Sequence, residues 1–239
     1  EVEETEDFED FDPFLFSILE DARKEMIDII QNRDLPIKER TMLVLGMAHD
    51  MQGRINRFDM FTCSDVIEKY TTEKARAFVK NHLAQKDKAT EEKLTRELFE
   101  KLYKLEVLRD DWEETLHKTQ NTLFFTMQES YAQLRKEFES YKEEHKEIDI
   151  HLEQIFVYFL FTYFPGAVYD GMVFAKAQMA VYCTWMVELL WMAEWLNAGR
   201  VLKKDKMTKL LYGFSREVEH SDENLKRVDK MMEKKCLLN

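Results

Sequence analysis

Residues 155–164 read IFVYFLFTYF, and residues 172–196 read MVFAKAQMAVYCTWMVELLWMAEWL. Both segments are apolar around most of a helix circumference, which is typical of helices that other helices surround. Pro165 and Gly166 stand between them and predict a turn, and Gly199 predicts the end of the second helix. The two segments therefore predict a central apolar helix pair, and with it an all-α helical bundle.

Neither segment predicts a membrane span. The charge-free runs at residues 155–168 and 177–187 are shorter than the roughly 20 apolar residues that a helix needs to cross a bilayer. Lys176, Glu188 and Glu194 also interrupt the second segment. We therefore expect core helices and no membrane partner.

The middle of the chain also favours helix. Neither glycine nor proline occurs between Gly53 and Pro165, and apolar residues across 94–148 recur close to every 3.6 residues. One helix over residues 90–148 would be about 88 Å long, which is too long for a compact domain of this size. We expect at least one break, at residues 110–111 or 121–122, because Asp and Asn side chains favour helix caps.

Three further helices are predicted before this stretch. The first ends near residues 32–34, and the second has Pro36 in its first turn. The third has Ser64 as its cap and runs through residues 66–83, and a polar connection follows at 86–92. Residues 1–12 are mostly acidic and predict a solvated linker, so a single all-helical domain is expected over residues 13–239.

Composition narrows the class of protein. The chain has 239 residues, of which 45% are hydrophobic, and a formal net charge of −12. This predicts a globular protein with a well-buried core and argues against a nucleic-acid partner. The cysteines, Cys63, Cys183 and Cys236, are too dispersed for a zinc knuckle or a disulfide framework, so we expect a reducing cytoplasm. Because the first residue is Glu1, we expect the chain to be part of a longer protein.

Residues 214–221, FSREVEHS, form a helix end with several polar side chains. The predicted buried face consists of Met207, Leu210, Leu211, Phe214 and Val218. Arg216 and His220 then lie on the opposite face, one turn apart. They form either a solvated helix end, which favours cations, or, with Glu219, a contact to a second domain or a substrate. Ser221 predicts the cap of a following short helix.

A metal site is the main catalytic alternative. Pairs with the Glu-x-x-His spacing of di-iron bundles occur twice, at Glu114/His117 and Glu217/His220. Such a site needs every ligand to project inward, whereas Glu217 and His220 fall outside the predicted buried face. We therefore expect no metal site. Glu188 and Glu194 are expected to pair with Lys176 or with an arginine of a neighbouring helix.

Aromatic residues of the two apolar segments line either a ligand pocket or, as such sets more often do, only the core. They are Tyr158, Phe159, Phe161, Tyr163, Phe164, Trp185, Trp191 and Trp195. No glycine-rich phosphate loop, nucleophile elbow or zinc-protease helix occurs in the sequence. The sequence therefore assigns no catalytic residue.

Three segments carry a family resemblance: RDLPIKER at residues 33–40, the aromatic helix at 152–164, and FSREVEH at 214–220. Together they resemble the carboxyl-terminal helical part of the bacterial flagellin lysine-N-methylase family, also called FliB. The resemblance implies a parent enzyme that transfers methyl groups from S-adenosylmethionine to lysine side chains of flagellin. It also implies an iron-sulfur cluster in a cysteine-rich amino-terminal domain.

This chain departs from the family in having no closely spaced cysteines. We therefore expect it to hold no cofactor and not to catalyse methyl transfer alone. The family motif matches Phe214, Ser215, Arg216, Glu219 and His220, which form the candidate surface toward the missing amino-terminal domain or flagellin. The alternative function is a non-catalytic helical module that binds a ligand or a protein.

Overall fold

The computed structural model describes residues 11–85, 87–125 and 129–238. Every regular element in these ranges is a helix, so the predicted all-α class is confirmed. The α-helices are α1 (Pro13–Gln31), α2 (Ile37–Ile55), α3 (Cys63–Tyr70), α4 (Glu73–Gln85), α5 (Lys88–Glu100), α6 (Trp112–Phe124), α7 (Tyr131–Glu144), α8 (Glu147–Tyr163), α9 (Ala167–Asp170), α10 (Val173–Asn197), α11 (Lys204–Glu219) and α12 (Asp222–Glu233). Short 3₁₀ turns are η1 (Met60–Thr62), η2 (Lys101–Lys104) and η3 (Phe164–Gly166).

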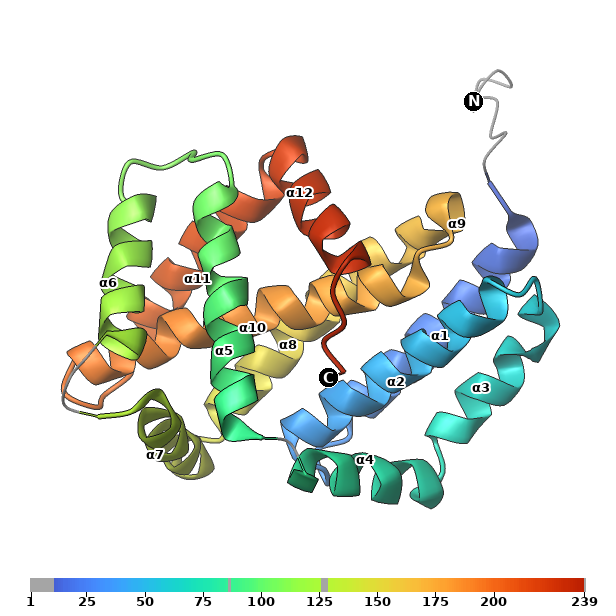
Figure 1. Cartoon of the computed structure of the whole chain (residues 1–239), viewed down its shortest axis with the longest axis horizontal. Coiled ribbons are helices and arrows are strands. Elements are labelled where there is room, and N and C mark those ends of the chain that lie inside the picture. The colour runs from blue at the N-terminus through green and yellow to red at the C-terminus, as the bar shows by residue number, and fades with distance from the viewer. Residues whose placement is uncertain (1–10, 86, 126–128, 239) are drawn as a thin grey trace.

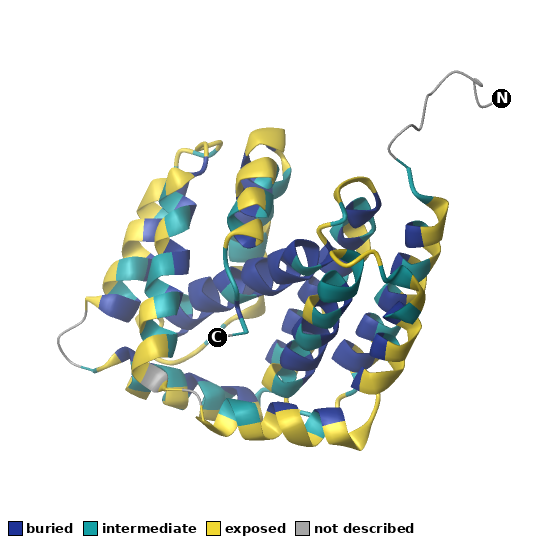
Figure 2. Ribbon diagram, turned by 45° about the vertical axis from the view of Figure 1, so that its right-hand side comes forward, coloured by how far each residue is buried: buried dark blue, intermediate teal, exposed yellow. Residues whose placement is uncertain are grey.

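The central element is α10. Figure 1 shows α1–α4 at one end of the molecule and α6, α7 and α11 at the other, joined by α8 and α10. Figure 2 shows that α10 is buried along most of its length. It packs against α2, α6, α8, α11 and α12. Gly199 ends this segment with a φ of 72°, and Arg200 N–H donates a 2.8 Å hydrogen bond back to the Trp195 carbonyl.

The predicted central pair is only half enclosed. Helix α8 packs along α10, and η3 and α9 form the turn predicted at Pro165 and Gly166. However, Tyr158 and Phe161 of α8 are 50% and 57% exposed. The apolar pattern of α8 exceeds its buried face, because nothing among the described residues fully covers its outer side.

The long helical stretch over residues 90–148 breaks three times in its described part: before α6, between α6 and α7, and between α7 and α8. The first break falls at the predicted place, where Asp111 precedes α6. The second prediction is wrong, because α6 continues through residues 121–122 to Phe124. The Thr122 hydroxyl exchanges hydrogen bonds with the side chain of Asn197, the last residue of α10, so it does not compete for the backbone of its own helix.

The region before this stretch needs two corrections. The predicted third helix is two helices, α3 and α4, because the Thr71 and Thr72 hydroxyls donate to carbonyls of the last turn of α3. Ser64 lies inside α3 and is not its cap. The polar connection is also shorter than predicted, since Asp87 caps α5 by accepting a 3.0 Å hydrogen bond from Thr90 N–H.

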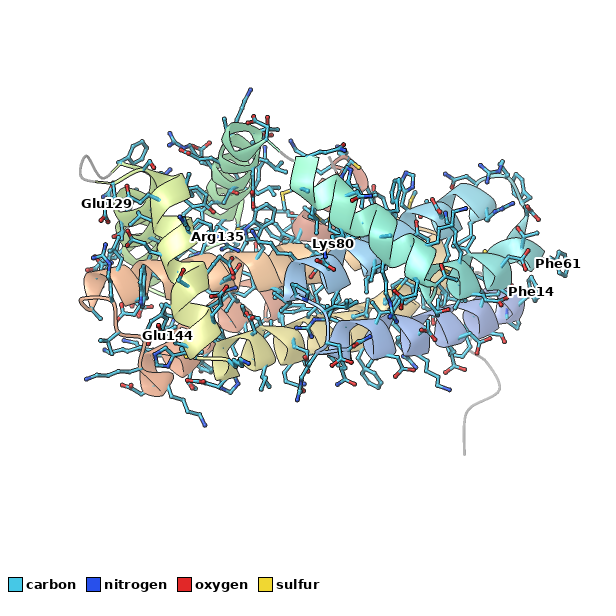
Figure 3. All side chains as sticks on the ribbon, turned by 90° about the horizontal axis from the view of Figure 1, so that it is seen from below. Phe14, Phe61, Lys80, Glu129, Arg135 and Glu144 are labelled. Atoms are coloured by element: carbon cyan, nitrogen blue, oxygen red, sulfur yellow. The ribbon has the colours of Figure 1, made fainter. Side chains whose placement is uncertain are left out.

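The start of the domain follows its sequence signals. Of the acidic linker predicted for residues 1–12, residues 1–10 lie outside the described residues. Asp12 caps α1 by accepting hydrogen bonds from the N–H groups of Phe14 and Leu15, at 2.9 and 3.0 Å. Phe14 then meets Phe61 across the surface, with ring centroids 4.8 Å apart (Figure 3). This aromatic pair lies at the end of the molecule opposite Glu129 (Figure 3).

Candidate functional site

The corner between α11 and α12 holds the family motif. Phe214 is fully buried and meets Trp112 of α6 edge-on, with ring centroids 6.4 Å apart. Val218 is also fully buried, so the predicted inner face of α11 faces the core. Ser221 accepts a hydrogen bond from Asn224 N–H at 3.2 Å, as expected for the cap of α12.

Glu217 corrects one expectation. Its side chain was predicted to lie outside the buried face, but it is fully buried. The segment between η2 and α6 covers it, and the Leu108 N–H donates a 2.8 Å hydrogen bond to its Oε2. Burial raises the pKa of Glu217 above its ordinary value. This carboxyl therefore serves local structure and is turned away from His220, which is exposed.

Asn224 was missed by the sequence interpretation. It is fully buried, and its Nδ2 donates to the carbonyls of Glu106 and Glu217 at 2.8 and 2.7 Å. Its Oδ1 accepts a 2.7 Å bond from Glu106 N–H. One amide side chain thus ties the corner to the segment that precedes α6. A lone Asn in a polar stretch has no periodic pattern that could reveal this role.

The basic residues of the motif, Arg216 and His220, point away from the core. Arg216 is half-buried and His220 is exposed. Within the described ranges, neither side chain makes a hydrogen bond or an ion pair. This agrees with the predicted orientation of the pair and leaves both side chains available to a partner.

Glu219, by contrast, lines a cavity of about 380 Å³ between α8, α10 and α11. The Ser215 hydroxyl, one turn earlier, donates a 2.5 Å hydrogen bond to its Oε2. The Tyr163 hydroxyl of α8 donates a 3.3 Å bond to its Oε1, and Tyr158 of α8 lines the same cavity. Burial, followed by the charge of Glu219, raises the pKa of both phenols, so they remain donors at neutral pH.

Two segments of the resemblance also meet each other. Glu153 of α8 is fully buried and accepts hydrogen bonds from Arg33 at 2.8 Å and from Arg40 at 2.7 Å. Burial by itself raises the pKa of Glu153, but the two guanidinium groups outweigh it and hold the pKa below its usual value. The RDLPIKER segment therefore fastens α1 and α2 to α8.

A second buried carboxylate, Glu188 of α10, has its partners on α7. Arg135 donates to it at 2.8 Å and Lys142 at 2.7 Å. Burial alone raises the pKa of Glu188, yet the two cations hold it well below its ordinary value. The predicted pairing with an arginine of a neighbouring helix is correct. Figure 3 labels Arg135 on α7.

The other predicted pairings differ. Glu194 is partly exposed and meets Lys118 of α6 at 3.4 Å. Lys176 contacts neither glutamate, but instead pairs with Asp170 at 2.8 Å and Asp229 at 2.6 Å. The reason is geometric, since Lys176 lies more than three turns before Glu188 along α10.

Arg135 and Glu188 form part of the wall of a larger cavity, of about 500 Å³, between α2, α5, α8 and α10. Phe156 and Trp185 supply aromatic walls. The Nε and Nη1 atoms of Arg135 are buried and have no hydrogen-bond partner in the described ranges. The predicted aromatic residues therefore do not line one pocket. Some line one or the other of the two cavities, some lie in the core, and Phe161 lies at the surface.

The candidate metal ligands do not lie together in one site. His117 of α6 lies 3.3 Å from the Tyr103 hydroxyl, and Glu188 is already paired with two cations. In the described ranges, no three His, Cys, Asp or Glu side chains form a group suited to a metal ion. Likewise, no helix of the described part is long and apolar enough to cross a membrane.

The arrangement defines a class: an all-helical domain with a polar motif at the α11–α12 corner and a carboxylate-bearing cavity beside it. The family model for the FliB lysine N-methylase C-terminal domain matches residues 23–239. No curated protein and no solved structure matches the chain. The chain belongs to the FliB lysine N-methylase C-terminal domain family, and the predicted family resemblance is confirmed.

Proposed function

We propose that this domain is the helical part of a bacterial lysine N-methyltransferase that modifies flagellin, with S-adenosylmethionine as the methyl donor. Membership of the FliB family supports this function. The free cysteines support a reducing cytoplasm as its compartment. The domain alone does not catalyse methyl transfer, and no step of the transfer is assigned to its residues.

The cysteines of this chain do not fit the iron-sulfur cluster that the resemblance implies. Cys63 and Cys183 are buried in α3 and α10, and burial raises the pKa of both thiols, which disfavours the thiolate that a cluster needs. We propose that the cluster lies in the cysteine-rich amino-terminal domain that the resemblance implies, that this domain also binds the methyl donor, and that it is the partner of the present domain.

The observation that carries the proposal is that the side chains of Arg216 and His220 have no partner within the described part of this domain. Both belong to the FSREVEH segment that carries the family resemblance, and both lack a hydrogen-bond or ion-pair partner in the described part of the chain. A motif that served only this domain's stability would have its polar groups paired internally. Arg216, Glu219 and His220 thus form the surface that meets the amino-terminal domain or the flagellin substrate.

The test is the double variant R216A/H220A in the full-length methylase. We expect flagellin methylation, measured by mass spectrometry of intact flagellin, to fall at least tenfold, while the melting temperature of the protein is unchanged. The matched control is K74A/K80A, which removes two exposed cations from α4 at the other end of the molecule. Full methylation by a folded R216A/H220A enzyme contradicts the proposed surface.

A non-catalytic ligand-binding module is the second candidate. The cavity of about 500 Å³ favours it, because Arg135 presents buried N–H groups without partners beside the aromatic walls of Phe156 and Trp185. Native mass spectrometry of the purified chain tests this candidate. A bound small molecule that is lost in W185A supports it, and an unliganded mass in every preparation rejects it.

A further inference from the structure

The cavity beside the family motif is an elongated groove. Along α11 it is lined by Lys204, Met207, Thr208, Leu211, Ser215 and Glu219, which follow one face of the helix. Its first and last lining residues are 15 positions apart, or roughly 22 Å along the helix axis. Helix α8 forms the opposite wall, and Trp191 of α10 contributes to the floor. The groove is therefore long enough for a short peptide segment to bind along it, with side chains of that peptide inside.

The two ends of the groove differ in charge. Lys204, with an exposed side chain, stands at one end, and Glu219, with a half-buried carboxylate, stands at the other. Among the described residues no Lys, Arg or His forms an ion pair with Glu219, whereas Glu153 and Glu188 each have two cationic partners. The carboxylate of Glu219 therefore has no cationic partner in the described part of the chain.

Hydroxyl groups hold this carboxylate in place. Ser215 and Tyr163 orient it through hydrogen bonds, but they add no positive charge. A carboxylate held in this way at a partly enclosed surface is preorganised for a cation, because little reorganisation accompanies binding. An anionic ligand would be repelled from this end of the groove.

The walls next to Glu219 are apolar and aromatic. Tyr158 and Phe159 of α8 and Leu211 of α11 line the approach to the carboxylate. A lysine side chain has the matching form, with an aliphatic stem that packs on apolar surface and an ammonium head that pairs with carboxylate and favours aromatic rings. Each Glu219 oxygen already accepts one hydroxyl proton, so a compact ammonium that needs a single remaining lone pair fits this carboxylate better than a planar guanidinium, which pairs best through two parallel bonds.

We infer that the α8–α11 groove is a docking site for a lysine side chain of the protein substrate, with Glu219 as the acceptor of its ammonium group. The inference rests on the proposed methylase function, which it deepens by naming a binding site. Glu219 stabilises the protonated amine, whereas methyl transfer needs the neutral amine. The groove is therefore a recognition site, and Glu219 is a positioning residue.

The first test is a titration of the 15N-labelled chain with the peptide acetyl-Gly-Ala-Lys-Ala-Gly-amide, followed by NMR. We expect amide shifts at Tyr158, Leu211 and Ser215, and none with the norleucine peptide, which keeps the stem and lacks the ammonium group. E219Q should weaken binding about tenfold or more, since it removes the charge but keeps an oxygen acceptor. The control E68Q removes an exposed carboxylate of α3 and should bind like the parent chain.

A second variant keeps the test decisive if E219Q does not fold. Thr208 is exposed on the groove side of α11, so T208W fills the groove without touching the carboxylate. We expect this variant to lose peptide binding and to keep its melting temperature. Equal binding of the lysine and norleucine peptides, or undiminished binding by folded E219Q or T208W, overturns the inference.

Steady-state kinetics of the full-length enzyme separate this inference from the proposed function. We expect E219Q to raise the KM for flagellin about tenfold or more and to change kcat by less than twofold, because it removes a docking contact. If the unaltered full-length protein does not methylate flagellin, the proposed function fails, and the peptide titration still decides the groove. If it methylates flagellin and E219Q has an unchanged KM, only the groove inference fails.

Discussion

The Tyr163 hydroxyl of α8 donates a hydrogen bond to Glu219 Oε1 of α11 over 3.3 Å. This contact joins the aromatic helix to the FSREVEH motif, two segments that are far apart in the sequence. Ser215 binds the other carboxylate oxygen from one turn earlier on α11. The spacing of Ser215 and Glu219 in the motif therefore has a structural cause, because residues four apart on a helix share a face.

Trp191 is expected to be a major contributor to stability. It is 1% exposed, and its Nε1–H donates a 3.1 Å hydrogen bond to the Met207 carbonyl. W191A should lower the free energy of unfolding by about 3 to 5 kcal/mol, as for other large-to-small core changes. Urea denaturation followed by circular dichroism measures the loss. F78A is the control, because Phe78 is 71% exposed, and a loss within about 0.5 kcal/mol is expected there.

Glu188 should stabilise the fold through its charge. E188Q removes the most buried anion that Arg135 and Lys142 share, but Glu139 still pairs with both cations. We therefore expect a loss of about 1 to 3 kcal/mol at pH 7. Because the folded-state pKa is depressed, this contribution is full above the unfolded-state pKa of about 4.3 and is lost as pH falls below it.

Urea denaturation of the parent chain and E188Q from pH 7 to pH 3 measures this difference. The gap in unfolding free energy should narrow toward acid. E194Q is the control on the same helix, since Glu194 forms one partly exposed ion pair and should contribute less than about 1 kcal/mol. A gap between the parent chain and E188Q that is constant with pH would falsify the charge-based explanation.

Glu217 should behave in the opposite way. Burial raises its folded-state pKa, so its stabilising contribution is full below the unfolded-state pKa and is lost as pH rises through the folded-state value. Gln resembles the protonated side chain, and E217Q should therefore be at least as stable as the parent chain at pH 7. The advantage should disappear near pH 4. Thermal denaturation at both pH values tests this, and a less stable E217Q at pH 7 contradicts it.

Arg216 and His220 should contribute little to folding. Neither has a hydrogen bond or ion pair in the described part of the chain. R216A/H220A should therefore change the free energy of unfolding by no more than about 0.5 kcal/mol. Chemical denaturation of this chain measures the change. An unfolded double variant would mean that the two side chains lie in the core.

The sequence by itself determined the fold class and much of its local structure. The all-round apolar pattern predicts α10 as a central helix, and Asp111 and Ser221 mark the starts of α6 and α12. These features follow from interactions between residues a few positions apart, so a single sequence contains them. The orientation of Arg216 and His220 away from the core follows in the same way from helical periodicity.

Only the tertiary structure decided which polar groups are buried and with what partners. Glu153 and Arg40 are 113 positions apart, and Glu106 and Asn224 are 118 apart, so no local pattern predicts either contact. The same holds for α8, whose aromatic sequence predicted full enclosure although its outer face is open. Apolar periodicity indicates which face of a helix is able to pack. Which side chains are buried, and which polar groups pair, depends on the distant helices that fold against that face. The groove at Glu219 exists for this reason, because α8 and α11 meet there only in the folded chain.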